Sequence, residues 1–258
     1  MIILVIGDII GRPGRLAVQK LLPGLRKQYN IGTVIANIEN TAGGIGATPS
    51  TVDELLECGV DVMTSGNHIW AHKEIIPYLE NDKPVIRPLN YPEGVQGRGY
   101  VIRDNVAVIN LIGRTFMSSY DCPFRTTDKL LKELGNKPAI KIIDFHAEAT
   151  SEKVALGRYF DGRVSAVLGT HTHIGTIDAR ILPEGTAYVT DIGMTGPKES
   201  VIGDSIDDVV QRFLTMIPKR LSVAKGTVIF TAILLDIDNK TGRAKSIERI
   251  YQEIEGED

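Results

Sequence analysis

The 258-residue sequence is poor in cysteine, with only Cys58 and Cys122. The two are far apart and form no C-x-x-C pair, which argues against a disulfide framework and against a sulfur-ligated zinc site. No G-x-S-x-G motif is present, and neither cysteine has a histidine near it in the sequence. A serine or cysteine hydrolase is therefore not expected.

Basic runs and long apolar runs are also missing. The formal net charge is −3, from 29 basic and 32 acidic residues. Proteins that bind duplex nucleic acid usually carry a basic patch, so we expect no such partner. No stretch reaches the roughly 18 apolar residues of a membrane span. The apolar start of the chain is about one strand long and lacks the basic region and cleavage site of a signal peptide. We expect a cytoplasmic protein without a membrane partner.

Apolar runs of strand length alternate with helical patterns in the first part of the chain, which favours parallel strands. The length allows one large α/β domain or two small ones. We expect a single domain over residues 1–258, an α/β fold with two stacked mixed β-sheets flanked by helices. The predicted strands are 2–6, 33–38, 60–64, 100–103, 106–112, 139–145, 164–168, 187–190, 227–236 and 244–251, and the predicted helices are 15–29, 48–58, 72–80, 127–134, 151–160 and 204–217.

Two of the five histidines, His171 and His173, follow the mostly apolar run 164–168 and are two residues apart. In an extended segment, alternate side chains point the same way. The pair can therefore face one centre or two adjacent centres. His72 does not follow a predicted strand, and we expect a structural role for it.

Other predicted strands also end in polar side chains, and the carboxyl ends of strands in α/β sheets carry the functional loops. Each of these residues has a structural alternative, such as helix capping for Asp8 or a turn for Glu39 and Asn40. Together they form a mixed oxygen and nitrogen set that suits Mn, Fe or Zn. Eight groups are too many for one ion but fit two ions about 3.5–4 Å apart that share a carboxylate. The eight are Asp8, Glu39, Asn40, Asn67, His68, His146, His171 and His173.

The order of these residues resembles the calcineurin-like metallophosphoesterases. The most specific elements are Gly66-Asn67-His68 and Gly169-Thr170-His171-Thr172-His173. The longer motifs at 7–14, 37–40, 144–153 and 190–196 are similar to the YmdB-like branch. This resemblance covers most of the chain, from residue 1 to about residue 235. It implies a two-metal phosphodiesterase of the metallophosphoesterase-like sandwich fold, with small phosphodiesters such as 2′,3′-cyclic nucleotides as substrates.

Three positions depart from the pattern of the superfamily. Ile10 stands where the first motif usually has histidine, Glu39 replaces an aspartate, and Ile69 follows His68 where glutamate is common. One of the two ions therefore has one imidazole fewer, while Glu39 is long enough to bridge both. Fe or Mn are the preferred ions, and Zn also fits.

The resemblance also implies roles for single residues. Asp8 and His173 would hold one ion, and Glu39 would bridge the two. The other ion would bind three residues: Asn67, His146 and His171. A hydroxide held by both ions would attack phosphorus in line.

Further roles concern the substrate. His68 would act as general acid on the leaving-group side. Asn40 is either a ligand or a substrate contact, and Gly43 and Thr170 are predicted to contact the substrate.

Two rival functions stay open. The chain could be a nucleotide-binding module without turnover, because Gly43-Gly44-Ile45-Gly46 follows a strand and could cradle phosphate. It is a weak match to G-x-G-x-x-G, since Pro49 occupies the last glycine position. Alternatively, the metal site could be regulatory, with a partner carrying the output. The sequence is compatible with a homo-oligomer.

Overall fold

The computed structural model describes residues 1–256, which form two β-sheets and the helices that cover them. The first sheet contains β1 (Ile2–Ile6), β2 (Asp8–Ile9), β3 (Thr33–Asn37), β4 (Val62–Thr64), β11 (Met194–Pro197), β12 (Val228–Ile237) and β13 (Ala244–Ile254). The second contains β5 (Tyr100–Arg103), β6 (Val106–Ile112), β7 (Ile140–His146), β8 (Ala166–Thr170), β9 (Arg180–Ile181) and β10 (Ala187–Val189). The helices are α1 (Gly11–Tyr29), α2 (Pro49–Glu57), α3 (Ile76–Glu80), α4 (Pro123–Leu134), α5 (Thr150–Tyr159) and α6 (Ile206–Thr215).

Both sheets are mixed. In the first, the order is β2-β11-β12-β1-β3-β4, and β13 also pairs with β12. β1, β3 and β4 are parallel, whereas β12 runs antiparallel to β1, with Ile2 opposite Asp236. In the second, the order is β5-β6-β7-β8-β10-β9, with parallel strands from β6 to β10 and an antiparallel strand at each edge. This arrangement confirms the predicted fold class.

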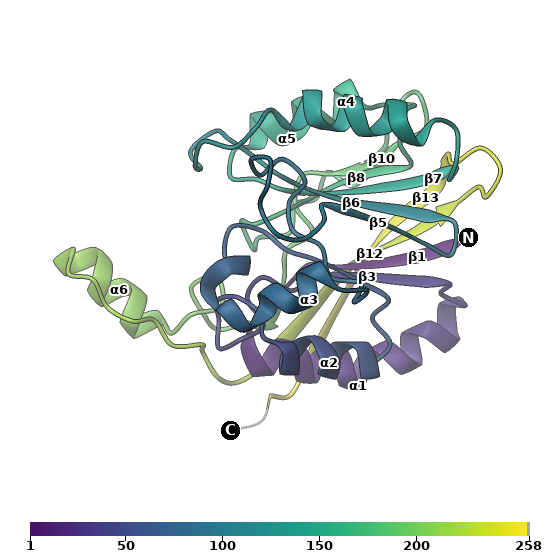
Figure 1. Ribbon diagram of the computed structural model, residues 1–258. Coiled ribbons are helices and arrows are strands. Elements are labelled where there is room, and N and C mark those ends of the chain that lie inside the picture. Colours follow the sequence, from purple (N-terminus) through teal and green to yellow (C-terminus); the bar gives the residue numbers. More distant parts are fainter. Residues whose placement is uncertain (257–258) are drawn as a thin grey trace.

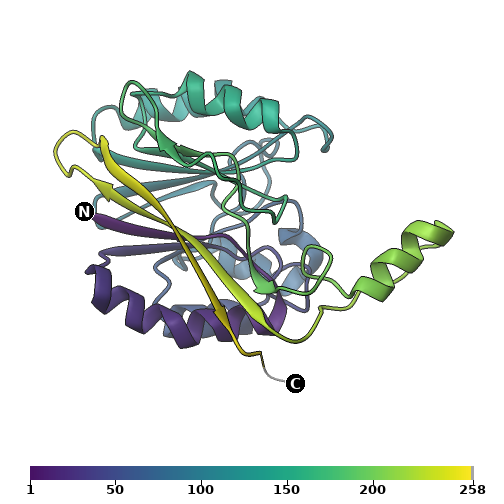
Figure 2. The same ribbon diagram turned by 180° about the vertical axis from the view of Figure 1, so that it is seen from behind.

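The sheets stack with helices outside. Figure 1 shows α4 and α5 above the second sheet and α1 and α2 below the first. Figure 2, from behind, shows the long hairpin of β12 and β13 crossing the back of the molecule. One apolar core joins the two sheets, with Val5 and Ile35 from the first and Val108 and Ile142 from the second. Separate cores lie under α1 and α2 and under α4 and α5.

Local sequence signals explain the helix that follows β3. Thr48 caps α2, because its hydroxyl accepts from the backbone N–H of Thr51 and the Thr51 hydroxyl accepts from the N–H of Thr48. Pro49 occupies the first turn, where no donor is needed. These interactions fix the start of α2.

Several predicted boundaries are wrong. α1 begins at Gly11 rather than at residue 15, and it contains Pro13 in its first turn, where proline costs no hydrogen bond. α6 is shorter than predicted, because Met216 adopts a left-handed conformation with φ 58° and ends the helix.

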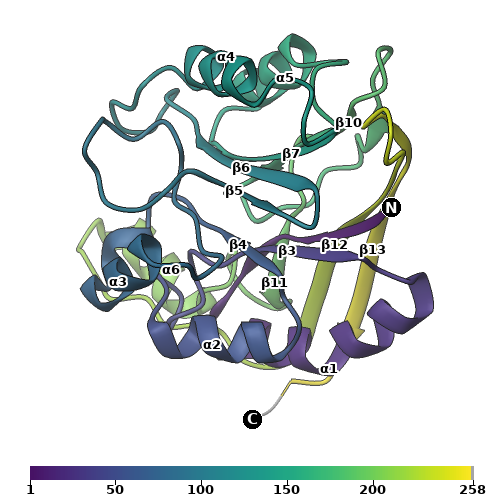
Figure 3. The ribbon, with the colours of Figure 1, turned by 45° about the vertical axis from the view of Figure 1, so that its right-hand side comes forward.

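Figure 3 shows α6 near α3 in projection, but Figures 1 and 2 show that it projects away from the sheets.

The loops after the parallel strands gather at one end of the two sheets. β1 starts at the N label in Figure 1 and runs toward the side from which α6 projects. Asp8, Glu39 and Asn67 follow strands of the first sheet, whereas His146 and His171 belong to the ends of β7 and β8 in the second.

In residues 1–256, no helix combines the length and the apolar character that a membrane crossing requires.

Candidate metal centre

The polar side chains at the strand ends come together as one cluster. The Nε2 atom of His146 lies 3.0 Å from Oε1 of Glu39 and 3.0 Å from Nδ1 of His171. Oδ1 of Asp8 lies 3.9 Å from Nδ1 of His146 and 3.9 Å from Nε2 of His173. Asp8, Glu39 and His146 are buried, and the two later histidines are partly exposed. Two sheets thus contribute to one site.

The chain around His171 and His173 is not extended, so the expected reason for their common direction is wrong. β8 ends at Thr170, and the two histidines have φ values of 99° and 66°. Left-handed backbone is uncommon for residues other than glycine and costs energy. The turn directs the histidines at different partners: His171 faces His146, and His173 faces Asn40.

Each of these two imidazoles is anchored through its outer nitrogen. Nδ1 of His173 donates to the carbonyl oxygen of Ile202 at 2.7 Å, and Nε2 of His171 donates to Glu148, with the atoms 3.0 Å apart. The inner nitrogen of each ring, Nε2 of His173 and Nδ1 of His171, is then free to offer a lone pair to the cluster. Metal-binding histidines are commonly held in this way by a carbonyl or a carboxylate.

His146 is anchored by a relay of hydroxyl and carboxylate. Thr170 donates its hydroxyl hydrogen to Oδ1 of Asp144 at 2.6 Å, so its oxygen can accept from Nδ1 of His146 at 3.0 Å. Asp144 also accepts from Asn37 and Thr64, and it is buried. Nε2 of His146 therefore points at Glu39 and His171.

Burial and neighbouring charges shift the pKa values of the cluster. Burial lowers the pKa of His146, but the charge of Glu39 and a hydrogen bond to it outweigh burial and raise the pKa to about 9. Burial raises the pKa of Glu39, yet His146 lowers it to about 2. Burial raises the pKa of Asp8 to about 6 and lowers the pKa of His171 to about 3. A proton between Glu39 and His146 occupies the place that a cation can take.

Asn40 and His68 form the open side of the cluster. Nδ1 of His68 donates to Oδ1 of Asn40 at 2.9 Å, and the backbone N–H of His68 donates to Oε2 of Glu39 at 3.1 Å. The amide nitrogen of Asn40 lies 3.2 Å from Nε2 of His173. The side chain of His68 is 37% exposed, whereas that of Glu39 is 1% exposed. His68 is therefore held by the cluster but accessible from solvent.

The residues present fit divalent ions. Among residues 1–256, Oδ1 of Asp8 and Oδ1 of Asn67 are buried oxygen atoms without a hydrogen-bond partner. Ligand atoms of Glu39, His146 and His171 lie within 4.8 Å of one another. A Cβ atom at Gly66 would lie 2.2 Å from Oε2 of Glu39, so the loop approaches the carboxylate with no room for a side chain. Buried oxygen atoms without donors are the atoms that a cation would satisfy.

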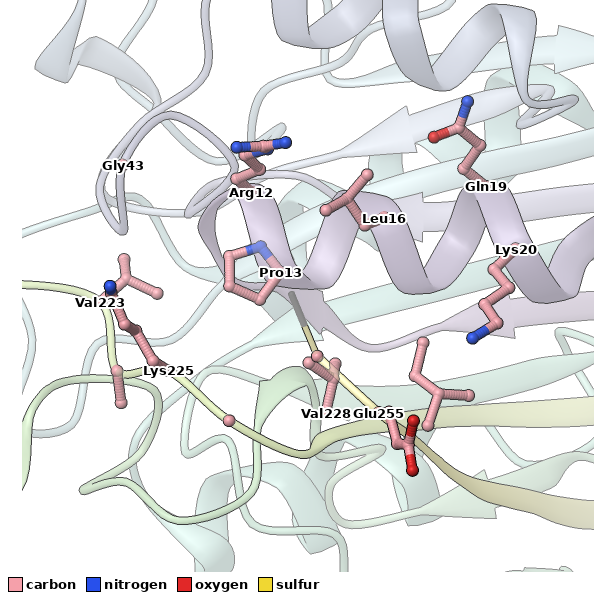
Figure 4. Close-up of a pocket in the computed structure, with 14 residues that line it drawn as sticks. Arg12, Pro13, Leu16, Gln19, Lys20, Gly43, Val223, Lys225, Val228 and Glu255 are labelled. Atoms are coloured by element: carbon pink, nitrogen blue, oxygen red, sulfur yellow. The ribbon is translucent and has the colours of Figure 1, made fainter. Parts of the chain in front are cut away.

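The two other predicted substrate contacts, Thr170 and Gly43, have different surroundings. The hydroxyl of Thr170 is buried and engaged with Asp144 and His146. Gly43 lines a separate, mostly apolar pocket of about 490 Å³, together with Arg12 and Val223. Figure 4 shows Gly43 on a loop beside the first turn of α1. Contact of either residue with a substrate stays a prediction. His72, expected to be structural, contacts the carbonyl oxygen of Ile45 at 3.1 Å.

A buried ion pair supports the histidine turn, and sequence reasoning gave it no role. Nζ of Lys153 donates to Oδ2 of Asp191 at 2.6 Å and to the carbonyl oxygen of Thr170 at 2.8 Å. The same carboxylate oxygen accepts from the hydroxyl of Thr172 at 2.8 Å and from its N–H at 3.2 Å. Lys153 and Asp191 are each 1% exposed. The ion pair thus anchors Thr172, which is the residue between His171 and His173 in the chain.

Sequence signals for the supporting residues are uneven. Asp144 lies two positions before His146 in the same strand, so its side chain falls on the same face, and this spacing could have identified it. Asp191 follows β10 and has the position of the other strand-exit residues. Glu148 and the carbonyl of Ile202 carry no such signal.

Replacement of Lys153 by methionine should destabilise the protein. It leaves Asp191 buried without its cation, and breaking a buried pair on one side costs about 3–5 kcal/mol. Unfolding in urea measures this free energy, and elemental analysis should show weaker retention of metal. The matched control is Lys198→Met, because Lys198 pairs with Glu253 on the surface and is 40% exposed; it should change stability by less than about 1 kcal/mol. Equal stability of Lys153→Met and the wild type would contradict the supporting role.

Comparisons with known proteins identify the family of this chain. A family model described as YmdB-like protein matches residues 4–250. A 2′,3′-cyclic-nucleotide 2′-phosphodiesterase of Bacillus subtilis is 47% identical over 254 residues, which cover 97% of this chain and 96% of that protein.

Two solved structures are also similar to this chain. The crystal structure of a phosphatase from Mycoplasma pneumoniae has a TM-score of 0.93 at 32% identity and covers 100% of this chain and 94% of its own. The calcineurin-like phosphoesterase YfkN of Bacillus subtilis shares the fold, with a TM-score of 0.59 at 12% identity over 98% of this chain and 90% of its own. The resemblance seen in the motifs is confirmed, and the chain belongs to the YmdB-like family.

Proposed function

We propose that this protein is a phosphodiesterase that uses two divalent transition-metal ions, Fe or Mn in first place and Zn as an alternative. Its substrates would be small phosphodiesters, with 2′,3′-cyclic nucleotides as the preferred class. The observation that carries the proposal is the set of three imidazoles anchored through their outer nitrogens, with inner nitrogens directed into the cluster that holds the buried carboxylates of Asp8 and Glu39. The activity named for the Bacillus subtilis relative supports the same reaction.

The ligands would divide between two ions. Asp8 and His173 would hold one ion, and Glu39 would bridge both. Asn67, His146 and His171 would hold the other. The free Oδ1 atoms of Asp8 and Asn67 support one oxygen ligand for each ion. Asn40, whose amide lies between His173 and His68, would contact the first ion or the substrate.

The chemistry divides between the ions and the chain. When bound, two such cations acidify water and neutralise charge on the phosphoryl oxygens. The chain itself positions the groups: Asp144 and Thr170 fix the ring of His146, and Asn40 fixes the ring of His68. His68 would give a proton to the leaving oxygen as the P–O bond breaks. Its exposure allows it to regain that proton from solvent.

Metal analysis combined with an assay panel tests the proposal. The purified protein, loaded with Mn or Fe, should contain two ions per chain and hydrolyse 2′,3′-cyclic nucleotides and a generic phosphodiester. A chelator should abolish turnover, and added metal should restore it. Two bound ions without turnover of any phosphodiester would favour the regulatory metal protein instead. Absence of bound metal would favour a nucleotide-binding module.

We predict that His171 and His173 serve different ions. They face different partners across the cluster, His146 and Asn40. His171→Ala and His173→Ala should therefore each lose about one of two ions, as the removal of one ligand weakens one site most. Elemental analysis of the purified variants gives the stoichiometry. Retention of both ions by either variant, or loss of both ions in both variants, would contradict the division.

Two further proposals concern organisation. We propose that residues 1–258 act as one domain, because side chains from both sheets share a core. We also propose a cytoplasmic location and a protein that is compatible with homo-oligomers. Small phosphodiesters are the proposed partners, and neither duplex nucleic acid nor a membrane is among them, which agrees with the net charge of −3.

A further inference from the structure

Three aromatic side chains from separate segments pack together near the metal centre. We call Trp70, Tyr91 and Tyr120 the aromatic cluster. The rings of Trp70 and Tyr91 have centroids 5.7 Å apart and planes at 82°, and those of Tyr91 and Tyr120 are 4.9 Å apart at 64°. Edge-to-face packing is a favourable arrangement for aromatic pairs and fixes the ring planes. All three side chains are partly exposed.

Their segments adjoin the metal centre. Trp70 lies in the 3-10 turn Ile69–Ala71, directly after His68. The loop that carries Tyr120 begins after β6, where the N–H of Gly113 donates to the carbonyl oxygen of His146 at 2.9 Å. The aromatic cluster thus borders the side of the centre that holds His68.

The loop of Tyr91 is fixed by its neighbour. Asn90 is buried, and its amide nitrogen donates to the carbonyl oxygens of Ile112 at 2.8 Å and of Asp121 at 2.9 Å. Its amide oxygen accepts from the N–H of Ile112 at 2.9 Å. The backbone next to Tyr91 is therefore held by hydrogen bonds, and the rings need little rearrangement to bind a ligand.

The hydroxyl of Tyr91 is held in its neutral form. Burial and a hydrogen bond to Tyr120 raise the pKa of Tyr91, and the charge of Glu39 acts in the same direction. The phenol is therefore neutral at physiological pH and does not repel a phosphate. The influence of Glu39 also places the ring within the electrostatic field of the metal centre.

Reaction geometry indicates what lies on this side. In the hydrolysis of a cyclic nucleotide, water attacks phosphorus opposite the leaving oxygen, a P–O bond to the ribose breaks, and that ribose oxygen takes up a proton. The ribose and its base must therefore lie on the side of the proton donor. His68 is the proposed donor, and the aromatic cluster begins two residues after it.

We propose that the aromatic cluster is a nucleobase subsite, in which Trp70 and Tyr120 stack on the base of the substrate. This inference rests on the proposed function and assigns the base of the nucleotide to a defined part of the site. Stacking on aromatic rings accepts every base, because each has a π-face. Purine and pyrimidine nucleotides are therefore both substrates, and specificity lies in the presence of a base rather than in its identity.

The kinetic experiment compares two substrates that differ only in the base: 2′,3′-cyclic AMP and ribose 2′,3′-cyclic phosphate. In metal-loaded Tyr120→Leu, kcat/KM for cyclic AMP should fall roughly 5- to 150-fold, which corresponds to the ~1–3 kcal/mol of stacking one base. The loss should appear mainly in KM. Turnover of the base-free substrate should stay unchanged. The matched control is Tyr159→Leu, because Tyr159 packs edge-to-face on Phe124 at 5.4 Å outside the centre.

A binding experiment does not depend on turnover. Trp70 is the only tryptophan in the chain, so intrinsic fluorescence reports on this one ring. Adenosine 3′-monophosphate should quench it in the wild type, whereas ribose phosphate should not. Equal kinetic losses on both substrates, or no quenching by the nucleotide, would overturn the subsite. Quenching without hydrolysis of any phosphodiester would uphold the subsite and reject the proposed enzymatic function.

Discussion

Replacement of Glu39 by glutamine should remove metal from the protein and lower turnover by at least about 10²–10³-fold, the range for losing one preorganised group that stabilises transition-state charge. Glutamine keeps the size of the side chain but removes its negative charge. Glu39 is buried, which raises its pKa, but the charge of His146 and a hydrogen bond from it lower that pKa to about 2. The carboxylate is therefore fully ionised at neutral pH. Two cations near each other repel, and the shared anion offsets that repulsion.

Elemental analysis and steady-state kinetics on the same preparation check this expectation. The metal content should fall from two ions to one or fewer. Because His68 and Asn40 both donate to the Glu39 carboxylate, circular dichroism should confirm that the variant is folded. Glu253→Gln serves as the control, since Glu253 pairs with Lys198 on the surface. If Glu39→Gln keeps both ions and normal turnover, the bridging assignment is wrong.

Replacement of His68 by alanine should have an effect that depends on the leaving group. A cyclic nucleotide releases a ribose alkoxide, which needs a proton as the P–O bond breaks. A positioned acid contributes roughly 10²–10⁴-fold, so turnover of the cyclic nucleotide should fall by that factor. A nitrophenyl phosphodiester releases a stable phenolate and should lose much less. His68 contacts the cluster through Asn40 and through its own backbone N–H, and it is not a proposed ligand. The metal content should therefore stay unchanged.

The alternative for His68 is a structural side chain that packs beside Trp70. In that case both substrates would lose turnover to the same extent, because the defect would lie in the loop and not in proton transfer. Loss of an ion from His68→Ala would instead make His68 a ligand. His72→Ala is the matched control, because the side chain of His72 contacts the carbonyl oxygen of Ile45 and has no proposed role in the reaction, and both substrates should react normally.

The sequence allowed the fold class and the location of the centre to be predicted, because both follow from strand periodicity. Parallel strands of one sheet place their carboxyl ends at one edge, which brings Asp8 and Glu39 together. His146 joins them because the second sheet stacks on the first. The direction of His171 and His173 could not be derived correctly. Their backbone is left-handed, and the turn that contains them is bonded to Lys153 and Asp191, which come from other segments.

Short elements were also beyond local reasoning. β2 and β9 have two residues each, too few to show periodicity, and β11 exists because Gly196 and Pro197 pair with β12. The groups that anchor the imidazoles could not be predicted from local sequence either. The carbonyl of Ile202 holds His173 through the tertiary fold, and a backbone carbonyl carries no mark in a sequence.

The place of β12 in the first sheet has a consequence for biosynthesis. β12 lies between β1 and β11, although it comes from the far end of the sequence. While the ribosome is still making the middle of the protein, β1 has one unpaired edge, and the sheet that carries Asp8 and Glu39 is incomplete. An unpaired strand edge invites association with other chains. The nascent chain is therefore most exposed to misassembly before β12 emerges.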